Sequence, residues 1–218
     1  MIALIVADGD VPTRVAVDRL LGAAEASLVV AADGGALKAE QIGFRPHIVV
    51  GDADSLSATD VDRLRANGSD VIVHPAAKDE SDTELAVREA VARGADRLLI
   101  VGAFGGRRLE HTVANLLLLC LPELRGRDVR LADGTSVVRL LEGPATLRVV
   151  GHAGDFVSLL PFVPAVDGVT TTGLAYPLVD EALSQGPARG LSNVMTADEA
   201  AVSASAGRLL VIHTRNRS

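Results

Sequence analysis

The centre of this sequence is the stretch HIVVGDADS at residues 47–55. Its apolar run ends at Gly51, and Asp52 and Asp54 follow, which is typical of a buried strand that leads into a polar loop. In an open α/β sheet, ligands bind beyond the carboxyl ends of the strands. Two carboxylates at such an end can share one hard cation, and Mg²⁺ in proteins usually also holds substrate phosphates. A plain turn is the alternative, because Gly and Asp are common in turns and Asp caps helices.

A similar polar loop follows the strand expected at residues 28–32. Asp33-Gly34-Gly35 comes directly after it, and the residues from 36 to 42 have a helical pattern. Glycines at such a position let backbone N–H groups approach an anion at the start of a helix. A hairpin turn is the alternative for Asp-Gly, but no strand pattern follows it. The arrangement therefore favours an anion site.

A third polar loop, KDESDTE at residues 78–84, lies between a strand expected at 71–73 and a helix expected to reach residue 92. Asp82 has two interpretations. It either faces the same cation as Asp52 and Asp54, with Lys78 near a phosphate, or it only stabilises the first turn of its own helix. The second interpretation gains support because residues 81 and 84 have the spacing of a capping box.

The loop GAFGGRR at residues 102–108 precedes a helix that we expect to end near Pro122. Arg108, His111 and Asn115 are spaced three and four residues apart, so they share one face of that helix. A glycine pair before a first turn with arginines is suited to cradle phosphate. The alternative is a solvated basic first turn, which the helix macrodipole does not favour.

The alternation of strands and helices predicts a mostly parallel sheet with helices on both faces, over residues 1–126. Beyond Gly126 the apolar segments are short, glycines and prolines separate them, and helical periodicity is weak. This texture predicts an all-β sandwich over residues 127–218. The fold class is therefore α/β, with a catalytic domain followed by a smaller all-β domain.

Composition excludes several classes of protein. The chain has 218 residues, a net charge of −7 and no lysine- or arginine-rich block, which argues against nucleic acid as a partner. The single cysteine, Cys120, excludes an internal disulfide and a multi-cysteine metal site. We see no apolar run long enough for a membrane helix and no signal peptide, so we expect a cytoplasmic protein. The sequence also lacks a Walker A motif and a Gly-x-Gly-x-x-Gly motif, which disfavours P-loop kinases and Rossmann dehydrogenases.

Six motifs, in order along nearly the whole chain, resemble those of the thiamine pyrophosphokinase family. They are ADGG at 32–35, GDADS at 51–55, KDESDTEL at 78–85, GGR at 105–107 with EH at 110–111 and NL at 115–116, TGLAYPL at 172–178, and LSN at 191–193. The resemblance implies transfer of pyrophosphate from ATP to the hydroxyl of thiamine, giving thiamine diphosphate and AMP. It also implies Mg²⁺ and a homodimer with its active sites at the subunit interface.

Taken with the loops above, the resemblance implies three groups of site residues. The metal ligands and catalytic carboxylates are Asp52, Asp54 and Asp82. The ATP contacts are Asp33, Gly34, Lys78, Asp79, Gly105, Gly106, Arg107, Arg108, His111 and Asn115. The thiamine contacts are Asp54, Tyr176, Ser192 and Asn193.

The sequence departs from the family in two places. The family usually shows Gly-Gly-Arg, one residue, then Asp-His, whereas here two residues separate Arg107 from Glu110. Either Arg107 or Arg108 therefore holds the place of the family arginine. Thr172 stands where the family more often has Ser, which is a mild change.

Two other functions stay open. The first is a pyrophosphokinase of the same architecture that acts on another alcohol, such as a hydroxymethylpterin. The motifs at 172–178 and 192–193 favour thiamine over this alternative. The second is a non-catalytic nucleotide-binding module, which the loss of an acidic cluster would favour; none is lost.

Overall fold

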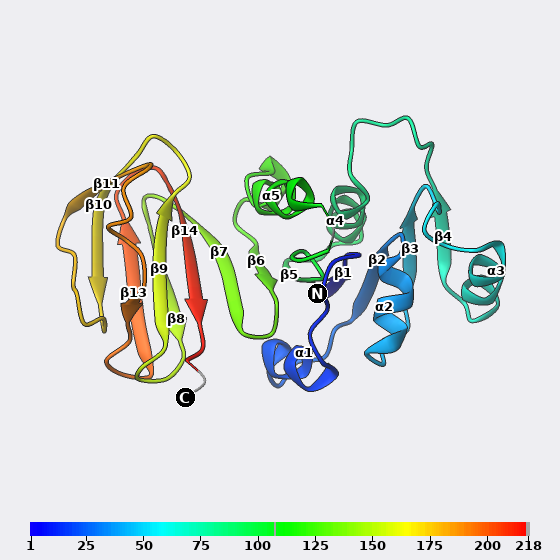
Figure 1. Cartoon of the computed structure of the whole chain (residues 1–218), viewed down its shortest axis with the longest axis horizontal. Coiled ribbons are helices and arrows are strands. Elements are labelled where there is room, and N and C mark those ends of the chain that lie inside the picture. Colours follow the sequence, from blue (N-terminus) through cyan, green and yellow to red (C-terminus); the bar gives the residue numbers. More distant parts are fainter. Residues whose placement is uncertain (107, 217–218) are drawn as a thin grey trace. The chain divides into compact units, whose positions relative to one another are not determined.

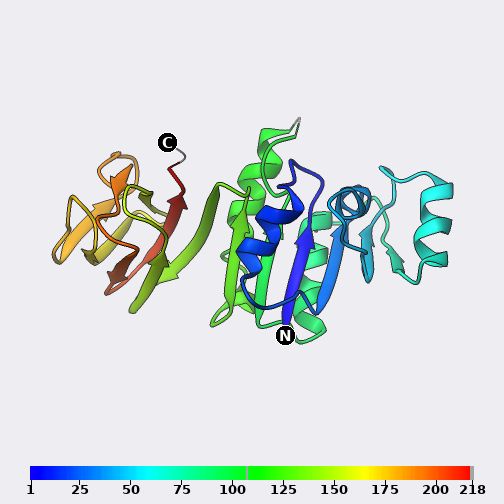
Figure 2. The same cartoon turned by 90° about the horizontal axis from the view of Figure 1, so that it is seen from below.

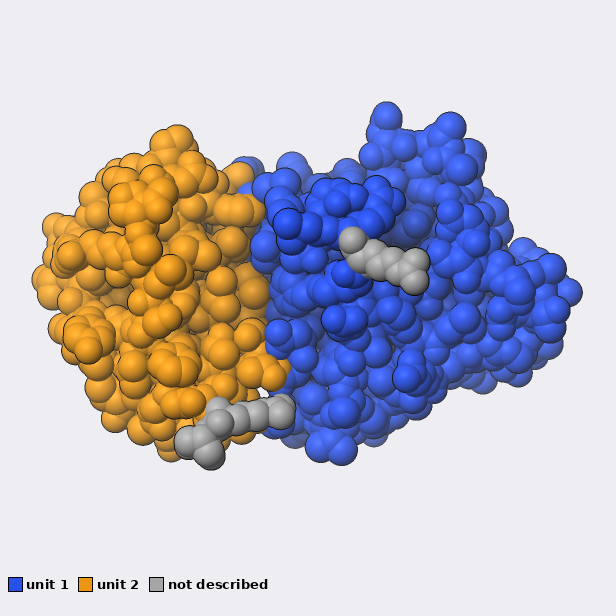
Figure 3. All heavy atoms as spheres, in the orientation of Figure 1, with its two compact units in different colours: residues 1–134 blue, residues 135–218 orange. Residues whose placement is uncertain are grey.

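The chain forms two compact units, Met1–Gly134 and Thr135–Ser218 (Figure 3). The computed structural model describes residues 1–106 and 108–216. The division comes later than residue 126 because the strand at Asp128–Ala132, which the sequence analysis assigned to the second domain, pairs in parallel with Arg97–Val101. It therefore belongs to unit 1.

Unit 1 is built on a parallel sheet in the order β6-β5-β1-β2-β3-β4. Its strands are β1 (Ile2–Val6), β2 (Leu28–Ala32), β3 (Ile48–Gly51), β4 (Asp70–Val73), β5 (Arg97–Val101) and β6 (Asp128–Ala132). Every residue of β2 and β3 is buried. Continuous burial of this kind is expected for central strands that are covered on both faces.

The helices lie on both faces of this sheet: α1 and α2 on one, α4 and α5 on the other (Figures 1 and 2). Their bounds are α1 (Arg14–Leu21), α2 (Gly35–Gln41), α3 (Ala58–Ala66), α4 (Asp82–Ala92) and α5 (Leu109–Leu118), with a short 3₁₀ helix, η1 (Pro122–Leu124). Thr13, Ser57 and Ser81 cap α1, α3 and α4 with side-chain oxygens, which satisfies backbone donors at the helix starts. The connection through α4 crosses over β1, β2 and β3 and brings β5 beside β1.

Helix α5 ends at Leu118 and not near Pro122. Leu121 has an extended backbone, with φ −57° and ψ 131°. A proline disfavours helical geometry in the residue before it, so the helix must stop earlier.

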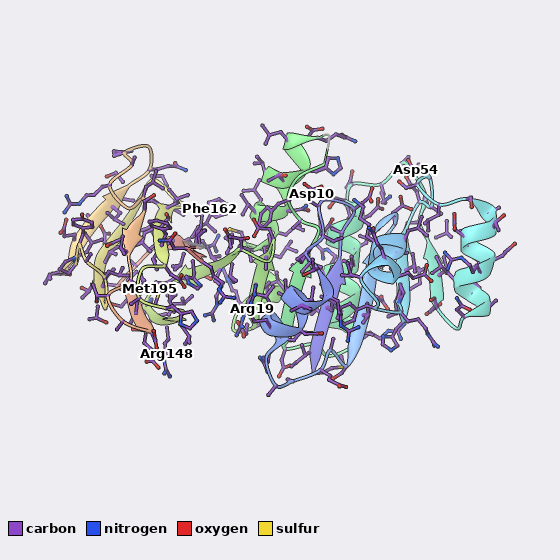
Figure 4. All side chains as sticks on the ribbon, turned by 60° about the horizontal axis from the view of Figure 1, so that its bottom comes forward. Asp10, Arg19, Asp54, Arg148, Phe162 and Met195 are labelled. Carbon is purple, nitrogen blue, oxygen red and sulfur yellow. The ribbon has the colours of Figure 1, made fainter. Side chains whose placement is uncertain are left out.

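Unit 2 consists of two antiparallel sheets, β7-β14-β9-β12 and β8-β13-β10-β11. The strands are β7 (Ser136–Glu142), β8 (Ala145–Val150), β9 (Phe156–Pro161), β10 (Ala165–Thr172), β11 (Glu181–Ser184), β12 (Asn193–Val194), β13 (Glu199–Ala204) and β14 (Arg208–Thr214). One cluster of buried side chains draws on both sheets, with Val157 and Leu209 from one and Val166 and Val202 from the other. Met195, labelled in Figure 4, is also part of this core.

The expected fold class is confirmed: a mostly parallel α/β part is followed by an antiparallel, sandwich-like β part. Among the described residues, no helix combines the length and apolar character needed to cross a bilayer.

Candidate active site

The loops after β1, β2, β3 and β5, with the segment before α4, line a cleft of about 670 Å³ in unit 1. Because the strands are parallel, these loops meet at one edge of the sheet, where Asp10 and Asp54 both lie (Figure 4). Many of the predicted site residues line the cleft: Asp33, Asp52, Asp54, Lys78, Asp82, Gly105, Gly106, Arg108, His111 and Asn115. Gly34 and Asp79 are not among the lining residues. Arg107 lies outside the described residues.

Three carboxylates from three loops form an acidic group in this cleft. Each of Asp33, Asp52 and Asp82 has an oxygen within 4.8 Å of an oxygen of the other two. The sequence predicted Asp54 as the third member of this group, whereas the structure places Asp33 there. Carboxylate oxygens in this number and spacing suit a hard cation such as Mg²⁺.

Asp33 reaches the acidic group through an unusual backbone. Its φ is 45°, in the left-handed region, and a Cβ at Gly51 would lie 2.9 Å from the Asp33 Cβ. Only glycine at position 51 therefore lets β3 pass this close to Asp33. The backbone N–H of Ser55 donates to Asp33 Oδ2 at 3.2 Å.

The Asp33 carboxyl group is buried and only partly satisfied. Its Oδ1 has no hydrogen-bond partner among the described residues. Burial raises the pKa of Asp33, although the hydrogen bonds from Ser55 oppose the shift. A buried acceptor left without a donor is costly, so this oxygen is available to a ligand.

Lys78 supplies positive charge to the acidic group. Its ammonium lies 3.0 Å from Asp82 Oδ1 and 3.8 Å from Asp52 Oδ2, and its side chain is 12% exposed. Desolvation works against the charged ammonium, but Asp82 and Asp52 raise the pKa of Lys78 overall. Asp82 Oδ1 is buried and has no hydrogen bond, so its contact with Lys78 is an ion pair without hydrogen-bond alignment.

Asp54 lines the same cleft but is exposed. Ala53 has a φ of 62°, and this left-handed residue separates Asp52 from Asp54. The Asp54 backbone N–H donates to Asp52 Oδ1 at 3.2 Å, and the Ser55 hydroxyl donates to Asp54 Oδ1 at 3.1 Å. Its role as a metal ligand and thiamine contact stays a prediction.

The loop between β5 and α5 packs closely against the loop after β1. Gly105 has a φ of 75°, and a Cβ there would lie 2.0 Å from Asp10 Oδ2. Asn115 is buried, and its amide donates to the carbonyl of Ala103 at 2.9 Å, so it anchors this loop. Arg108 is exposed beside the cleft and pairs with Glu110 at 2.6 Å.

The cleft residues that were missing from the sequence prediction include Asp8 and Lys38. The Lys38 ammonium donates to the carbonyls of Asp8 and Gly9 and lies 3.3 Å from Asp8 Oδ1. Asp8 comes directly after the apolar run at residues 2–7, and this position was the available signal for it. Nothing in the helical pattern of 36–42 distinguishes Lys38 from a solvated lysine.

Unit 2 contains a second, smaller pocket of about 190 Å³. Tyr176, Ser192 and Asn193 line it, as do Arg189 and Gly190, which the sequence analysis did not single out. A Cβ at Gly190 would lie 2.1 Å from the carbonyl oxygen of Leu159, so this position requires glycine. The structure thus brings together the residues of two motifs that are separated by more than ten positions in sequence.

These features define what the sites can do. The cleft in unit 1 offers hard oxygen ligands, two lysines and a glycine-rich loop before a helix, which suits a metal-bound polyphosphate. Transfer of a phosphoryl-type group needs mainly positioning and neutralisation of charge. The pocket in unit 2 offers an aromatic ring and hydroxyl and amide groups, which suits a small polar acceptor.

Comparison with known proteins agrees with this chemistry. The family model for the catalytic domain of thiamin pyrophosphokinase matches residues 21–131, and that for its vitamin B1 binding domain matches residues 146–209. Thiamine pyrophosphokinase of Bacillus subtilis (strain 168) is 26% identical over 191 residues, covering 87% of this chain and 88% of that protein.

Solved structures give the same result. The thiamin pyrophosphokinase from Geobacillus thermodenitrificans is 31% identical, with a TM-score of 0.83 over 100% of this chain and 99% of the other. The Bacillus subtilis enzyme has a TM-score of 0.86 over 100% of both chains at 23% identity, which shows the shared fold. The matched domains and the relative that is similar over its whole length show that the chain belongs to the thiamin pyrophosphokinase family of enzymes.

Proposed function

We propose that this enzyme transfers pyrophosphate from ATP to the hydroxyl of thiamine. The thiamine oxygen attacks the β-phosphorus of ATP, the bond from that phosphorus to the α-bridging oxygen breaks, and AMP leaves. The hydroxyl proton passes to a base or to solvent. The observation that carries the proposal is the acidic group of Asp33, Asp52 and Asp82, which lies beside Lys78 at the carboxyl ends of the strands. The match of this chain to the catalytic-domain family supports the same reaction.

The acidic group fits Mg²⁺, because it offers several carboxylate oxygens and one of them, Asp33 Oδ1, is buried without a partner. When bound, Mg²⁺ would neutralise phosphate charge and orient the β-phosphorus. We propose Asp33, Asp52 and Asp82 as the residues that hold it, with Asp54 nearby in the same cleft.

The remaining residues of the cleft act on ATP. Lys78 is placed to shift from the carboxylates to a phosphate oxygen once other positive charge has arrived. Arg108, with Gly105 and Gly106 before α5, is suited to hold the phosphates. Asn115 holds the shape of this loop through the Ala103 carbonyl.

We further propose that the pocket around Tyr176 in unit 2 takes thiamine, with Ser192 as a direct contact. Thiamine is a flat cation, and the face of a tyrosine ring attracts cations. The match of residues 146–209 to a vitamin B1 binding domain supports this assignment.

The homodimer stays a prediction, as does the cytoplasmic location. A face of α5 supports the dimer: Leu109, Val113 and Leu117 are spaced four residues apart and are 76%, 49% and 53% exposed. Such an apolar stripe favours contact with a partner. Light scattering after size exclusion measures the mass, and Val113→Lys should shift it towards one subunit.

The test of the function is incubation of the purified protein with ATP, MgCl₂ and thiamine, followed by identification of both products. We expect AMP and thiamine diphosphate in equal amounts. ADP with thiamine monophosphate would overturn the proposal. A parallel reaction with a hydroxymethylpterin should give no AMP above background, and excess EDTA should abolish turnover.

A further inference from the structure

The side chain of Asn193 is largely committed to the main chain. It is 8% exposed. Its Oδ1 accepts from the N–H of Tyr176 at 3.0 Å and from the N–H of Val194 at 2.9 Å, and its Nδ2 donates to the carbonyl of Tyr176 at 2.6 Å. A carboxamide can accept two hydrogen bonds and donate two. Both acceptor positions are therefore occupied, and one N–H remains.

These bonds matter because Tyr176 has no other main-chain support in the described structure. The neighbouring pairing stops just before it, with the Ala175 N–H donating to the Val194 carbonyl at 2.8 Å. Both polar groups of the Tyr176 main chain are bonded to Asn193. The Tyr176 side chain itself is exposed at the edge of the pocket.

Ser192 differs from its neighbour. Its φ is 56°, a left-handed value that is uncommon for serine, and its backbone N–H donates to the Ser158 hydroxyl at 3.0 Å. The Ser192 hydroxyl itself makes no hydrogen bond to any residue that the structure describes. Ser192 is therefore free to contact a ligand, whereas Asn193 is already engaged.

We infer that Asn193 is a positioning residue, which acts on the acceptor by holding Tyr176 in place and not by contacting the acceptor itself. This revises the role that the sequence suggested for Asn193, and it rests on the proposed function of the pocket. The two hydrogen bonds hold the peptide groups on either side of the Tyr176 Cα and so fix the position from which the ring extends. The ring then binds the acceptor with less loss of conformational freedom.

A double-mutant cycle on the full chain tests the inference, with thiamine binding measured by equilibrium dialysis. We expect Asn193→Ala and Tyr176→Ala each to weaken binding roughly tenfold, the usual scale for losing buried hydrogen bonds or a ring contact. If Asn193 acts through Tyr176, the double variant binds no more weakly than Tyr176→Ala alone. Losses that add would overturn the inference.

A second readout needs no ligand. Tyr176 is the only tyrosine and the chain has no tryptophan, so its fluorescence reports this residue alone. Asn193→Ala should lower the fluorescence anisotropy of Tyr176, and an unchanged anisotropy would overturn the inference. The matched control is Thr170→Val, which removes a bond from the Asp180 N–H to Thr170 Oγ1 at 3.0 Å and should leave the anisotropy unchanged.

Asn193→Asp covers the case in which the alanine variant fails to fold. The aspartate keeps both accepted bonds but places a carboxylate oxygen against the Tyr176 carbonyl, where Asn193 donates. It should therefore also lower the anisotropy of Tyr176 and weaken thiamine binding, and the loss of binding should vanish when Tyr176 is replaced by Ala. If the wild-type chain binds no thiamine, the proposed function of the pocket fails. The anisotropy measurement would still decide whether Asn193 holds Tyr176.

Discussion

Replacement of Lys78 by Met should make the acidic group bind free divalent metal more tightly while reducing turnover. In the structure the Lys78 ammonium takes the place of a cation between Asp82 and Asp52, at 3.0 Å and 3.8 Å. A metal that arrives without ATP must displace it. Methionine keeps most of the side-chain volume and removes the charge, so the variant isolates the electrostatic effect.

The size of the effect follows from the two distances. With an effective dielectric constant of about 20, the two contacts correspond to about 5 and about 4 kcal/mol of Coulomb attraction. Desolvation of the partly buried ions offsets most of this, so the net value is roughly 1–3 kcal/mol. A metal that no longer competes with Lys78 should therefore bind roughly tenfold more tightly.

The assay is titration with Mn²⁺ in the absence of nucleotide, followed by paramagnetic resonance of the free ion. Lys38→Met is the matched control, because Lys38 lies in the same cleft but is held by the carbonyls of Asp8 and Gly9. It changes the net charge equally and should change Mn²⁺ affinity much less. Unchanged or weaker Mn²⁺ binding in Lys78→Met would refute the reasoning.

Three further outcomes are expected. Arg108→Ala should raise the KM for ATP roughly tenfold, since a charge-assisted contact to phosphate is lost, and an unchanged KM would exclude this contact. Asp54→Asn should be nearly inactive, and Asn193→Ala should lose most of its activity at thiamine concentrations well below KM. At such concentrations the two variants should regain activity when their subunits exchange, if sites form across a dimer; no recovery after exchange confirmed by mass would contradict this. Despite burial, which acts in the opposite direction, hydrogen bonds from the Asn216 and His152 backbone and from His213 lower the pKa of Asp155 below its ordinary 3.8. Its stabilisation is therefore complete above about pH 4 and is lost as pH falls through the folded pKa. Asp155→Asn should flatten the acid limb of urea stability below about pH 4; an unaltered acid limb would rule this out.

The sequence predicted the sheet of unit 1 well because its signals are local. Apolar runs such as 28–32 and 48–50 end in polar loops, and the capping-box spacing at Ser81 marks a helix start that the structure confirms. The strand β6 was assigned to the wrong unit because a parallel pairing with β5 leaves no mark in its own residues. In unit 2 the sequence predicts strands at 137–141, 147–150, 156–160 and 209–213, which the structure confirms. It does not predict β10 and β13, because threonine, alanine and glutamate dilute their alternation.

The acidic group shows a similar limit. The sequence places Asp52 and Asp54 two residues apart, which suggests one shared ion, but the left-handed Ala53 stands between them and Asp54 is exposed. Asp33 takes the third position only because Gly51, eighteen residues later, leaves room beside it. Such a contact between two neighbouring strands depends on tertiary structure, and no pattern around Asp33 alone could reveal it.

The structure also explains why this group is better regarded as a binding site than as a set of helix caps. A cap stabilises its helix by accepting backbone hydrogen bonds. Asp33 Oδ1 is instead buried without a hydrogen bond, and Asp33 has a left-handed backbone that costs free energy. Asp82 Oδ1 accepts no backbone hydrogen bond either, and its partner is the Lys78 ammonium. Ser81, not Asp82, caps α4. The unpaired oxygen and the left-handed backbone of Asp33 destabilise the folded chain. We infer that they are kept at the strand ends because a bound cation and phosphates would supply the missing partner.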